Sequence, residues 1–292
     1  MSLVDLLVCP ICHGTLDLSG RPRCTNCSTS YARRGSFLDM TPNPPPHEDV
    51  ASRWQLWEQL QANGAKSYAT APALNLAVGD RPDATEFGQF CDLRGKVLDI
   101  GCGPQAFPSY GGRGAADILV GIDPLVGDTE REFEFVGGIG EYLPFRDGTF
   151  DRVLFGTSLD HVLSPVRALH EARRVLTPTG FVCIWYGEGH EHGPATNARR
   201  AATAVRLIKS AARLVRSGDI MALARRIGLR LGLLPDPQAY IKDMTIPTGA
   251  VDHFHFQHLT GTMVKDWLQE AELKPETITH GPAGWFVRAV PS

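Results

Sequence analysis

The chain has 292 residues, of which 43% are hydrophobic and 21% are charged. This is the composition of an ordinary globular protein, and the length favours one large domain with a small appendage. No apolar run approaches the roughly 18 residues that a membrane span needs. The first residues, MSLVDLLVCP, lack the basic and long apolar regions of a signal peptide. We therefore expect no membrane span, a cytoplasmic location and reduced thiols.

The charge is distributed unevenly along the chain. The segment from Arg199 to Arg230 holds nine Lys and Arg residues and one acid, so it contributes +8 to the formal net charge of −3 and the rest contributes −11. Its basic and apolar residues recur at helical spacing on different faces, which predicts inserted basic helices at 199–232. Such a helix can be a solvated face packed over the core, or can bind a phosphate-bearing substrate, nucleic acid or a membrane surface.

Four of the seven cysteines form two C-x-x-C pairs separated by eleven residues, namely Cys9, Cys12, Cys24 and Cys27. The two-residue spacer lets both thiolates of a pair reach one tetrahedral ion at about 2.3 Å. Two disulfides are the alternative, which a reducing compartment disfavours. Because four thiolates leave no open coordination position, we expect a structural zinc in a ribbon over residues 1–41, a segment too short to fold without such a metal.

A proline-rich stretch, TPNPPPH, ends this ribbon and predicts an extended linker at 42–47. A helical lead-in follows over 48–95. From residue 96 to the end the pattern alternates between strand and helix, apart from the insertion at 199–232, which is typical of a parallel α/β sheet. The predicted strands are KVLDI, DILVGIDPL, FDRVLFGTSLD, FVCIW and GWFVRAV. One helix is predicted to begin after Ser164 and another after Thr260 or Thr262.

A glycine turn and a carboxylate follow the first two of these strands. Gly101 and Gly103 permit a tight turn and a close approach of a ligand to the backbone, although a tight turn without a ligand needs glycine as well. About twenty residues further on, the next strand ends at Asp123, whose carboxylate can accept hydrogen bonds from both hydroxyls of a ribose. The pair therefore predicts a nucleoside-binding site.

The run from Lys96 to Gly180 resembles the class I S-adenosylmethionine-dependent methyltransferases of the small-molecule type. It carries VLDIGCG, then Asp123, then the combination LPF-x-D-x-x-FD, H-V and E-x-x-R-V-L-x-P-x-G. The resemblance implies an α/β, Rossmann-like, seven-stranded methyltransferase sheet with S-adenosyl-L-methionine as its cofactor. The insertion would then be a helical lid.

The resemblance also implies contacts with the cofactor. The residues implied to contact the cofactor are Asp99, Gly101, Cys102, Gly103, Asp123, Pro124, Ile139, Gly140, Glu141, Thr157 and Ser158. Asp99 would hold the methionine amino end, Asp123 the ribose, and Thr157 with Ser158 would lie beneath the sulfonium. Two positions depart from the family pattern: Gln105 replaces its third glycine, and Ile139 stands where relatives often carry an aspartate. Backbone groups around Gly140, or Glu141, would therefore have to contact the adenine.

The N-terminal pattern CPxCxG-x-L followed by C-x-x-C-x-x-x-Y and GSFLDMTP also has relatives. It resembles the small zinc-binding proteins that activate tRNA and rRNA methyltransferases, and the zinc finger of bacterial rRNA guanine methyltransferases. RNA is therefore a candidate substrate, but similar ribbons are fused to methyltransferases of sugar and natural-product pathways. RNA binding needs a wide positive surface with exposed aromatic residues, which the negative remainder of the chain disfavours.

Histidines supply the candidates for the acceptor side. By resemblance, His161 lies on the substrate side of the sulfonium as a candidate base, unless it is an orienting or structural histidine. The run DHFHFQHLT predicts an extended wall beside the acceptor, with Phe254 and Phe256 on one face and His253 and His255 on the other.

Two further groups of histidines are possible metal ligands. One is the His-x-His of GEGHEHGP, and the other is the set His253, His255 and His258. The spacing of neither group is diagnostic of a metal.

Taken together, these patterns predict an enzyme that transfers a methyl group from S-adenosylmethionine to an oxygen of a small molecule such as a sugar or nucleotide-sugar. A phosphate-bearing acceptor is one candidate. An RNA base methyltransferase is the alternative within the same class. A non-catalytic binding or scaffold protein with the methyltransferase fold is the alternative from another class. The sequence leaves the acceptor and the oligomeric state open.

Overall fold

The computed structural model of the chain describes residues 2–43, 45–71, 82–187, 239–281 and 284–292. The chain divides into a main unit, residues 1–189 and 245–292, and a second unit, residues 190–244. The described part of the second unit is 239–244, which includes the 3-10 helix η1 (Ala239–Asp243). The predicted basic helices at 199–232 and the His-x-His at 190–192 lie outside the described residues.

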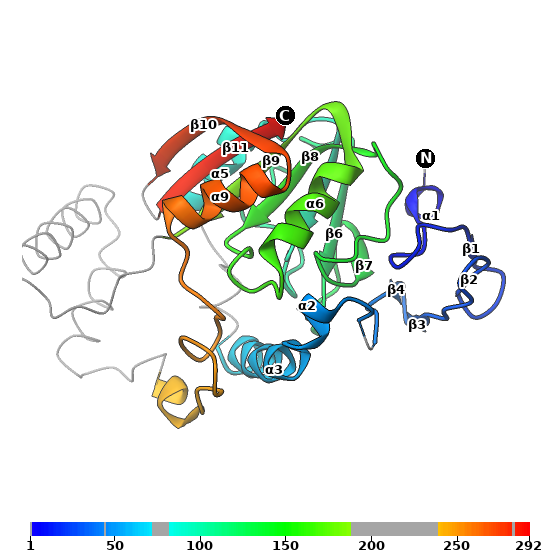
Figure 1. Cartoon of the computed structure of the whole chain (residues 1–292), viewed down its shortest axis with the longest axis horizontal. Coiled ribbons are helices and arrows are strands. Elements are labelled where there is room, and N and C mark those ends of the chain that lie inside the picture. The colour runs from blue at the N-terminus through cyan, green and yellow to red at the C-terminus, as the bar shows by residue number, and fades with distance from the viewer. Residues whose placement is uncertain (1, 44, 72–81, 188–238, 282–283) are drawn as a thin grey trace, which may run out of the picture. The chain divides into compact units, whose positions relative to one another are not determined.

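The main unit is built on a nine-stranded sheet with the order β10-β11-β9-β8-β5-β6-β7-β4-β3 (Figure 1). The strands from β9 to β7 are parallel to one another, and β11 and β10 run antiparallel at one end. The central strands read as nearly continuous apolar runs, as expected for strands that are covered on both faces. The seven strands from residue 96 onward are β5 (Lys96–Ile100), β6 (Ile118–Asp123), β7 (Glu134–Gly137), β8 (Phe150–Gly156), β9 (Leu176–Tyr186), β10 (Leu273–Gly281) and β11 (Gly284–Pro291).

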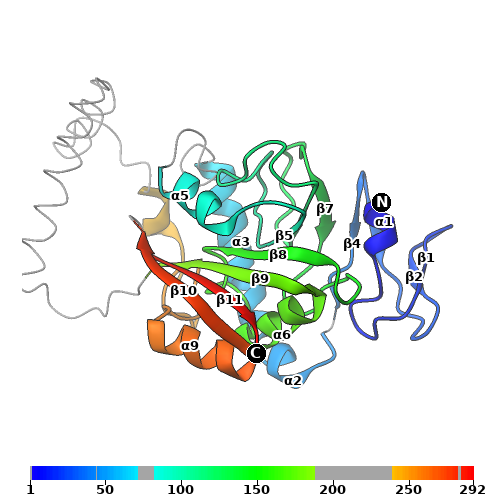
Figure 2. The same cartoon turned by 90° about the horizontal axis from the view of Figure 1, so that it is seen from above.

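Helices cover both faces of the sheet (Figure 2). The helices α6 (Pro165–Val175) and α9 (Gly261–Glu270) lie on one face, and α5 (Pro82–Cys91) lies on the other. The predicted start of α9 is confirmed, because the Thr260 side chain accepts a hydrogen bond from the Met263 amide at 3.2 Å. None of the described helices combines the length and the apolar character needed to cross a membrane.

Two further helices precede the sheet. They are the short α2 (Glu48–Ala51) and the long α3 (Trp54–Thr70). The buried residues of α3 are Trp57, Leu60 and Ser67, which recur at helical spacing and therefore share one face. Two of them, Trp57 and Leu60, belong to a small apolar cluster with Ile139 and Phe256. Both helices lie within the range 48–95, and α3 reaches the cavity at the carboxyl end of the sheet.

The N-terminal segment adds two strands to the seven that were expected. The strand β4 (Phe37–Asp39) pairs in parallel with β7, and β3 (Ala32–Arg34) pairs antiparallel with β4. Before them lie α1 (Leu3–Leu6) and a two-stranded ribbon of β1 (Leu16–Asp17) and β2 (Arg23–Cys24). The prediction of a seven-stranded sheet therefore needs correction to nine, because β4 takes up the open backbone edge of β7.

A second connection ties the N-terminal segment to the sheet. Leu7 bridges Phe145, and the Val8 amide donates to the Pro144 carbonyl at 3.0 Å. Met40, directly after β4, is fully buried in the same core cluster as Phe145, and its amide donates to the Gly137 carbonyl at 2.7 Å. The N-terminal segment and the sheet thus share one hydrophobic core.

This shared core makes a stability prediction. We expect Met40→Ala to lower the free energy of unfolding of the whole main unit by about 2–5 kcal/mol, because it leaves a cavity in the core. Urea unfolding followed by circular dichroism measures the change. The control is Val4→Ala, at a side chain that is 54% exposed, where a change within about 0.5 kcal/mol is expected. A Met40→Ala protein with an unchanged unfolding midpoint would contradict the shared core.

Candidate active site

The carboxyl ends of β5, β6 and β8 open into a cavity of about 340 Å³. The carboxyl ends of parallel strands meet at one edge of a sheet, which is where open α/β folds bind ligands. Most of the predicted site residues line this cavity: Gly101, Cys102, Gly103, Asp123, Pro124, Ile139, Gly140, Glu141, Thr157, Ser158, His161 and His255. Asp99 and His253 do not line it.

The loop after β5 needs glycine at two positions for different reasons. Gly101 has a φ of +79°, and a Cβ placed there would lie 2.3 Å from the Ser158 Cβ. Gly103 has a φ of +69°, but a Cβ there would meet only the Tyr68 hydroxyl, at 3.7 Å. Gly101 is therefore required by packing, whereas Gly103 leaves space on the cavity side. The side-chain Nε2 of Gln105 donates to the Cys102 carbonyl at 2.8 Å and so closes the turn where the third glycine is missing.

Asp123 joins the loops after β5 and β6. One carboxylate oxygen accepts from the Gly103 amide and the other from the Leu125 amide, both at 2.7 Å. Burial raises the pKa of Asp123 to about 6, against the lowering effect of these two amides. Each carboxylate oxygen has a further lone pair, so the group can still accept hydrogen bonds from a ligand in the cavity. This geometry fits a ribose with two free hydroxyls.

Asp99 lies behind a tyrosine that sequence reasoning missed. The Tyr110 hydroxyl is 2.6 Å from both carboxylate oxygens of Asp99 and donates to them, and it is Tyr110 that lines the cavity. Burial raises the pKa of Asp99 to about 7. A contact of Asp99 with the methionine amino group would therefore have to run through Tyr110.

Glu141 reaches the cavity, but its carboxylate serves the start of α6. The same oxygen accepts from the Leu163 amide at 2.5 Å and the Ser164 amide at 3.0 Å. Ser164 stands at the N-cap of α6, where the helix was predicted to begin after it, yet its side chain makes no cap hydrogen bond. Glu141 thus accepts hydrogen bonds from backbone amides that have no partner within the helix at its start. The backbone of Ile139 and Gly140 is left for the predicted adenine contact.

The acceptor end of the cavity carries a pair of histidines. The rings of His161 and His255 have centroids 4.4 Å apart. The Nδ1 atom of His161 lies 3.1 Å from the Phe254 carbonyl, and Nδ1 of His255 lies 2.8 Å from both carboxylate oxygens of Asp252. The structure therefore brings together the first two of the three predicted catalytic histidines.

The segment 252–260 is not the extended strand that its alternation predicted. Asp252 accepts hydrogen bonds from the Phe254 and His255 amides, which bends the chain. As a result Phe254 and His255 both line the cavity, and Phe256 is buried under the Arg53 guanidinium, 4.5 Å from its ring centroid. His253 lies outside the cavity lining, and its carbonyl accepts from the Asn63 amide at 2.8 Å. The prediction that the two phenylalanines share one face and the two histidines the other is therefore wrong.

Sequence reasoning also missed the wall that α3 supplies. Its cavity-lining residues are Trp57, Leu60, Gln61, Gly64, Ser67 and Tyr68. Their spacing of three and four residues is that of one helical face, and this was the signal that could have found them. Burial raises the pKa of Tyr68 to about 12, so its hydroxyl stays protonated and can donate into the cavity.

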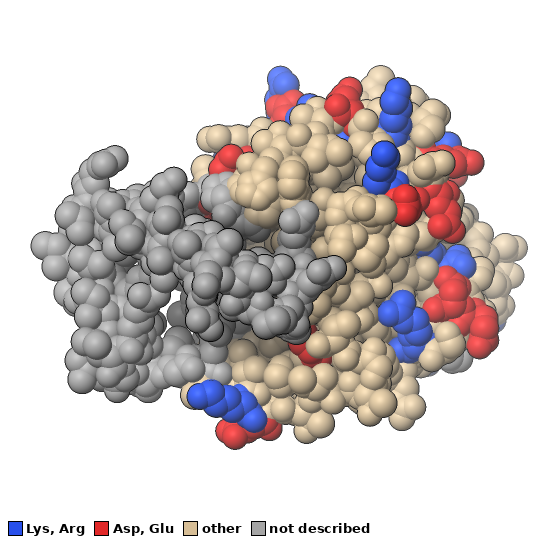
Figure 3. Space-filling view, turned by 60° about the vertical axis from the view of Figure 1, so that its left-hand side comes forward, with Lys and Arg blue, Asp and Glu red and all other residues tan. Residues whose placement is uncertain are grey.

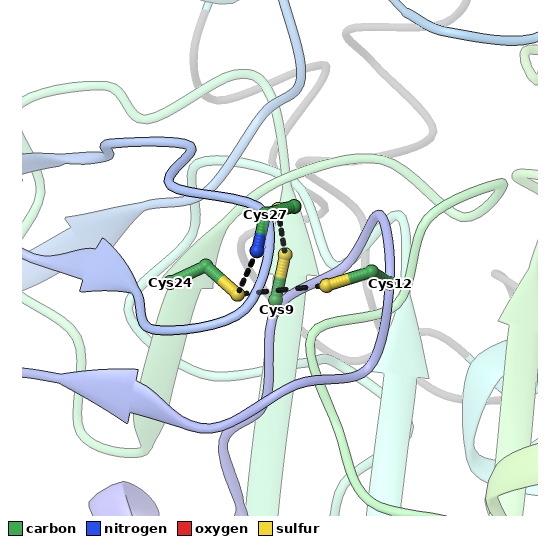
Figure 4. Close-up of side chains that lie close together, drawn as sticks. All are labelled: Cys9, Cys12, Cys24 and Cys27. Atoms are coloured by element: carbon green, nitrogen blue, oxygen red, sulfur yellow. Dashed lines mark hydrogen bonds between the residues drawn. The ribbon is translucent and has the colours of Figure 1, made fainter.

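The four predicted zinc ligands converge in the N-terminal segment (Figure 4). The sulfur atoms of Cys9, Cys12, Cys24 and Cys27 all lie within 4.8 Å of one another. Cys9 and Cys27 are 3.6 Å apart, and Cys12 and Cys24 are 3.5 Å apart. Sulfur atoms bound to one tetrahedral zinc ion at about 2.3 Å would be separated by about 3.8 Å. All four cysteines are free thiols, so the disulfide alternative is not what the structure shows.

The sheet order, the glycine loop after β5 and the carboxylate after β6 define a class I S-adenosylmethionine-dependent methyltransferase fold. Residues 98–184 match the family model described as a methyltransferase domain. This stretch of the chain is therefore similar to methyltransferase domains.

Two curated relatives extend this match. The chain is 34% identical over 109 residues to an uncharacterised methyltransferase of Schizosaccharomyces pombe, covering 30% of this chain and 38% of the relative. It is 28% identical over 218 residues to the ubiquinone/menaquinone biosynthesis C-methyltransferase UbiE of Methylobacterium nodulans, covering 72% of this chain and 81% of the relative. The chain spans about two fifths of the length of the first curated relatives that it matches.

A solved structure shares the fold. It is the 1,6-didemethyltoxoflavin N1-methyltransferase of Burkholderia thailandensis with bound 1,6-didemethyltoxoflavin and S-adenosylhomocysteine. The TM-score is 0.51 at 13% identity, and the match covers 90% of this chain and 99% of that one. At this identity the likeness concerns the fold alone.

The raised pKa of Asp123 makes a prediction about cofactor binding. Near its pKa of about 6 the carboxyl takes up a proton, and it then accepts ribose hydroxyls less well. We expect S-adenosylhomocysteine to bind about fourfold more weakly at pH 5.5 than at pH 7.5. Isothermal calorimetry across this range measures the affinity, and Asp123→Asn should flatten the dependence. An affinity that rises or stays constant as the pH falls would contradict the role of Asp123.

Proposed function

We propose that the chain is an active methyltransferase that transfers a methyl group from S-adenosylmethionine to an oxygen of a small molecule. The observation that carries this proposal is the continuity of one cavity, which runs from the Asp123 carboxylate to the imidazoles of His161 and His255. A nucleoside-binding end and a polar end with two ring nitrogens are what a cofactor and a hydroxyl acceptor require.

The chain's own residues divide the task between them. S-adenosylmethionine, when bound, supplies a methyl group on a positively charged sulfur. Asp123 accepts the ribose hydroxyls, and Gly103 lets the ligand lie against the backbone. His161 and His255 orient the acceptor hydroxyl at the point where its proton is removed. Alignment of acceptor and methyl contributes most, up to about 7–11 kcal/mol, and removal of the proton adds about 10²–10⁴-fold.

A small acceptor is favoured over RNA by the described surface. On the face shown in Figure 3, basic and acidic side chains are interspersed among the described residues, without a continuous basic area. RNA binding would need such an area. The basic segment at 199–232 lies outside the described residues, so an RNA substrate remains the alternative. Retention of the chain on total RNA with strong salt dependence would favour that alternative.

Methylation at carbon is a second candidate. The relative from Methylobacterium nodulans is named a C-methyltransferase of ubiquinone/menaquinone biosynthesis, and it covers 72% of this chain. Removal of a proton from an aromatic hydroxyl places negative charge on ring carbons as well as on oxygen, so the same pair of histidines serves both reactions. The position of the transferred methyl group in the product, read by nuclear magnetic resonance, separates the two.

We also propose that Cys9, Cys12, Cys24 and Cys27 hold a structural zinc ion. The support is chemical: four sulfur atoms converge, and the Asn26 and Cys27 amides donate to the Cys24 sulfur at 3.3 and 3.4 Å. A hydrogen bond from Thr29 lowers the pKa of Cys27 to about 6, whereas burial raises that of Cys9 to about 12. A metal ion would deprotonate both thiols and remove this difference.

The zinc proposal predicts a metal content. We expect purified chain to contain one zinc per molecule by mass spectrometry of the metal, and Cys24→Ser to lose it and to melt at a lower temperature. The expected cause is the loss of an ion that cross-links two turns. Cys183→Ala, at a buried cysteine outside the cluster, should keep the zinc. Wild-type chain without zinc, after purification free of chelators, would argue against the site.

The methyl-transfer proposal is tested with methyl-labelled S-adenosylmethionine and extracted metabolite pools. Asp123→Asn should weaken S-adenosylhomocysteine binding about 10- to 150-fold, since it loses charge-assisted hydrogen bonds of about 1.5–3 kcal/mol. His255→Gln should keep that affinity and slow transfer by about 100-fold or more. Cofactor binding without labelled product from any pool would favour a non-catalytic binding protein. A collapse of cofactor affinity in His255→Gln would overturn its placement at the acceptor end.

A further inference from the structure

Three side chains meet at the acceptor end of the cavity with their acceptor atoms facing one another. A carboxylate oxygen of Asp160 and one ring nitrogen each of His161 and His255 all lie within 4.8 Å. The closest approaches are 3.8 Å from Nε2 of His161 and 3.6 Å from Nε2 of His255 to the Asp160 carboxylate. Both histidines line the cavity.

The surroundings fix which nitrogen of each ring carries the hydrogen. Nδ1 of His161 lies 3.1 Å from the Phe254 carbonyl, which can only accept, so Nδ1 must donate. Nδ1 of His255 lies 2.8 Å from the Asp252 carboxylate and donates to it. When the rings are neutral, both Nε2 atoms therefore carry no hydrogen and each offers a lone pair. Carboxylate and carbonyl partners of this kind are what orient histidines that bind metal ions.

The third member of the cluster lacks a counter-charge. The Oδ1 atom of Asp160 is buried and has no hydrogen-bond partner in the described part of the chain. No Lys or Arg of the described residues forms an ion pair with Asp160; its nearest side-chain neighbours in the cluster are the two imidazoles. Two nitrogen lone pairs and a carboxylate that converge repel one another unless a cation lies between them.

We propose that Asp160, His161 and His255 bind a divalent first-row transition-metal ion that holds the acceptor oxygen. Two imidazole nitrogens and one carboxylate oxygen suit manganese, iron, cobalt or zinc better than magnesium or calcium. Metal–ligand distances of about 2.0–2.2 Å require the three side chains to close inward by less than about 1 Å each. Three protein ligands leave coordination positions open for an acceptor, as in catalytic sites. The cysteine cluster, with four thiolates, leaves none.

The inference rests on the proposed function and gives it a chemical step. The acceptor hydroxyl binds the ion and loses its proton to water, since a bound cation lowers the pKa of an oxygen ligand. The resulting oxyanion attacks the methyl carbon, the oxygen–carbon bond forms, and the carbon–sulfur bond breaks with its electron pair left on sulfur. No electron is gained or lost by the ion. His161 and His255 thus act as ligands and position the acceptor.

The test is a titration with Mn²⁺ followed by electron paramagnetic resonance, which reports the disappearance of the free ion. Soft thiolate sites discriminate against Mn²⁺, so the cysteine cluster does not compete. We expect one Mn²⁺ per chain, and at least tenfold weaker binding in each of Asp160→Asn, His161→Ala and His255→Gln. Asp252→Asn, which removes the charged partner of His255 but keeps an oxygen for the Phe254 and His255 amides, should weaken binding about 10- to 100-fold. His170→Gln, at an exposed histidine of α6 outside the cluster, should bind as the wild type does.

Calorimetry with S-adenosylhomocysteine on the same proteins separates this inference from the proposed function. Retained binding shows that a variant is folded and that its cofactor site is intact. Wild-type chain that binds S-adenosylhomocysteine but no Mn²⁺, or that binds Mn²⁺ equally well in all three ligand variants, overturns the metal site and leaves the methyltransferase standing. Wild-type chain that binds Mn²⁺ but not S-adenosylhomocysteine contradicts the proposed methyltransferase function instead. Should the variants fail to fold, the number of Mn²⁺ ions bound per wild-type chain decides whether the metal site stands.

Discussion

The cofactor end of the cavity depends on one hydrogen bond, from the Gly103 amide to the Asp123 carboxylate. It joins two loops that follow the neighbouring parallel strands β5 and β6, in which Ile100 stands in register with Ile122. The Gly101 amide adds a bond to the Ile122 carbonyl at 2.8 Å. A buried carboxylate without such donors would be protonated or displaced, because burial disfavours its charge. The same bond thus shapes the glycine turn and keeps an acceptor for ribose in place.

A chain of contacts connects the N-terminal segment with this cavity. Residues 6–8 form backbone hydrogen bonds with residues 144–146. The Phe145 carbonyl accepts a hydrogen bond from the Arg174 guanidinium at 2.7 Å. Arg174 also pairs with Glu171 on α6, at 2.7 Å, and Glu141 holds the other end of that helix. Arg174 and Glu171 are mostly buried, so losing one partner would leave a charge uncompensated. The N-terminal segment can therefore influence the cavity by positioning α6, without contributing a residue to the cavity lining.

The sequence was most informative where a local rule fixes the structure. The glycines and Asp123 could be placed because strand ends, tight turns and acidic residues follow a fixed geometry in parallel sheets. Buried strands and the Thr260 cap followed from apolar runs and turn chemistry. The extra strands β3 and β4 could not be foreseen, since three-residue strands carry little pattern and pairing with β7 is a long-range contact. Tyr110 was not predicted either, because its hydrogen bond to Asp99 is a contact that only the folded structure shows.

The two ends of the cavity differ in where their residues come from. The cofactor end is built from loops that lie within or beside the stretch 98–184, which matches the methyltransferase family. The acceptor end takes Phe254 and His255 from a segment after the insertion, and its wall from α3 before the sheet. These two parts lie outside the matched stretch, whereas His161 lies inside it, so the family match covers the cofactor end more fully than the acceptor end. The alternation of DHFHFQHLT failed as a guide because Asp252 bends the backbone, and that bend is what turns His255 toward Asp160. The chemistry of the acceptor must therefore be read from the cluster of Asp160, His161 and His255, in which each ring nitrogen has a role set by its neighbour.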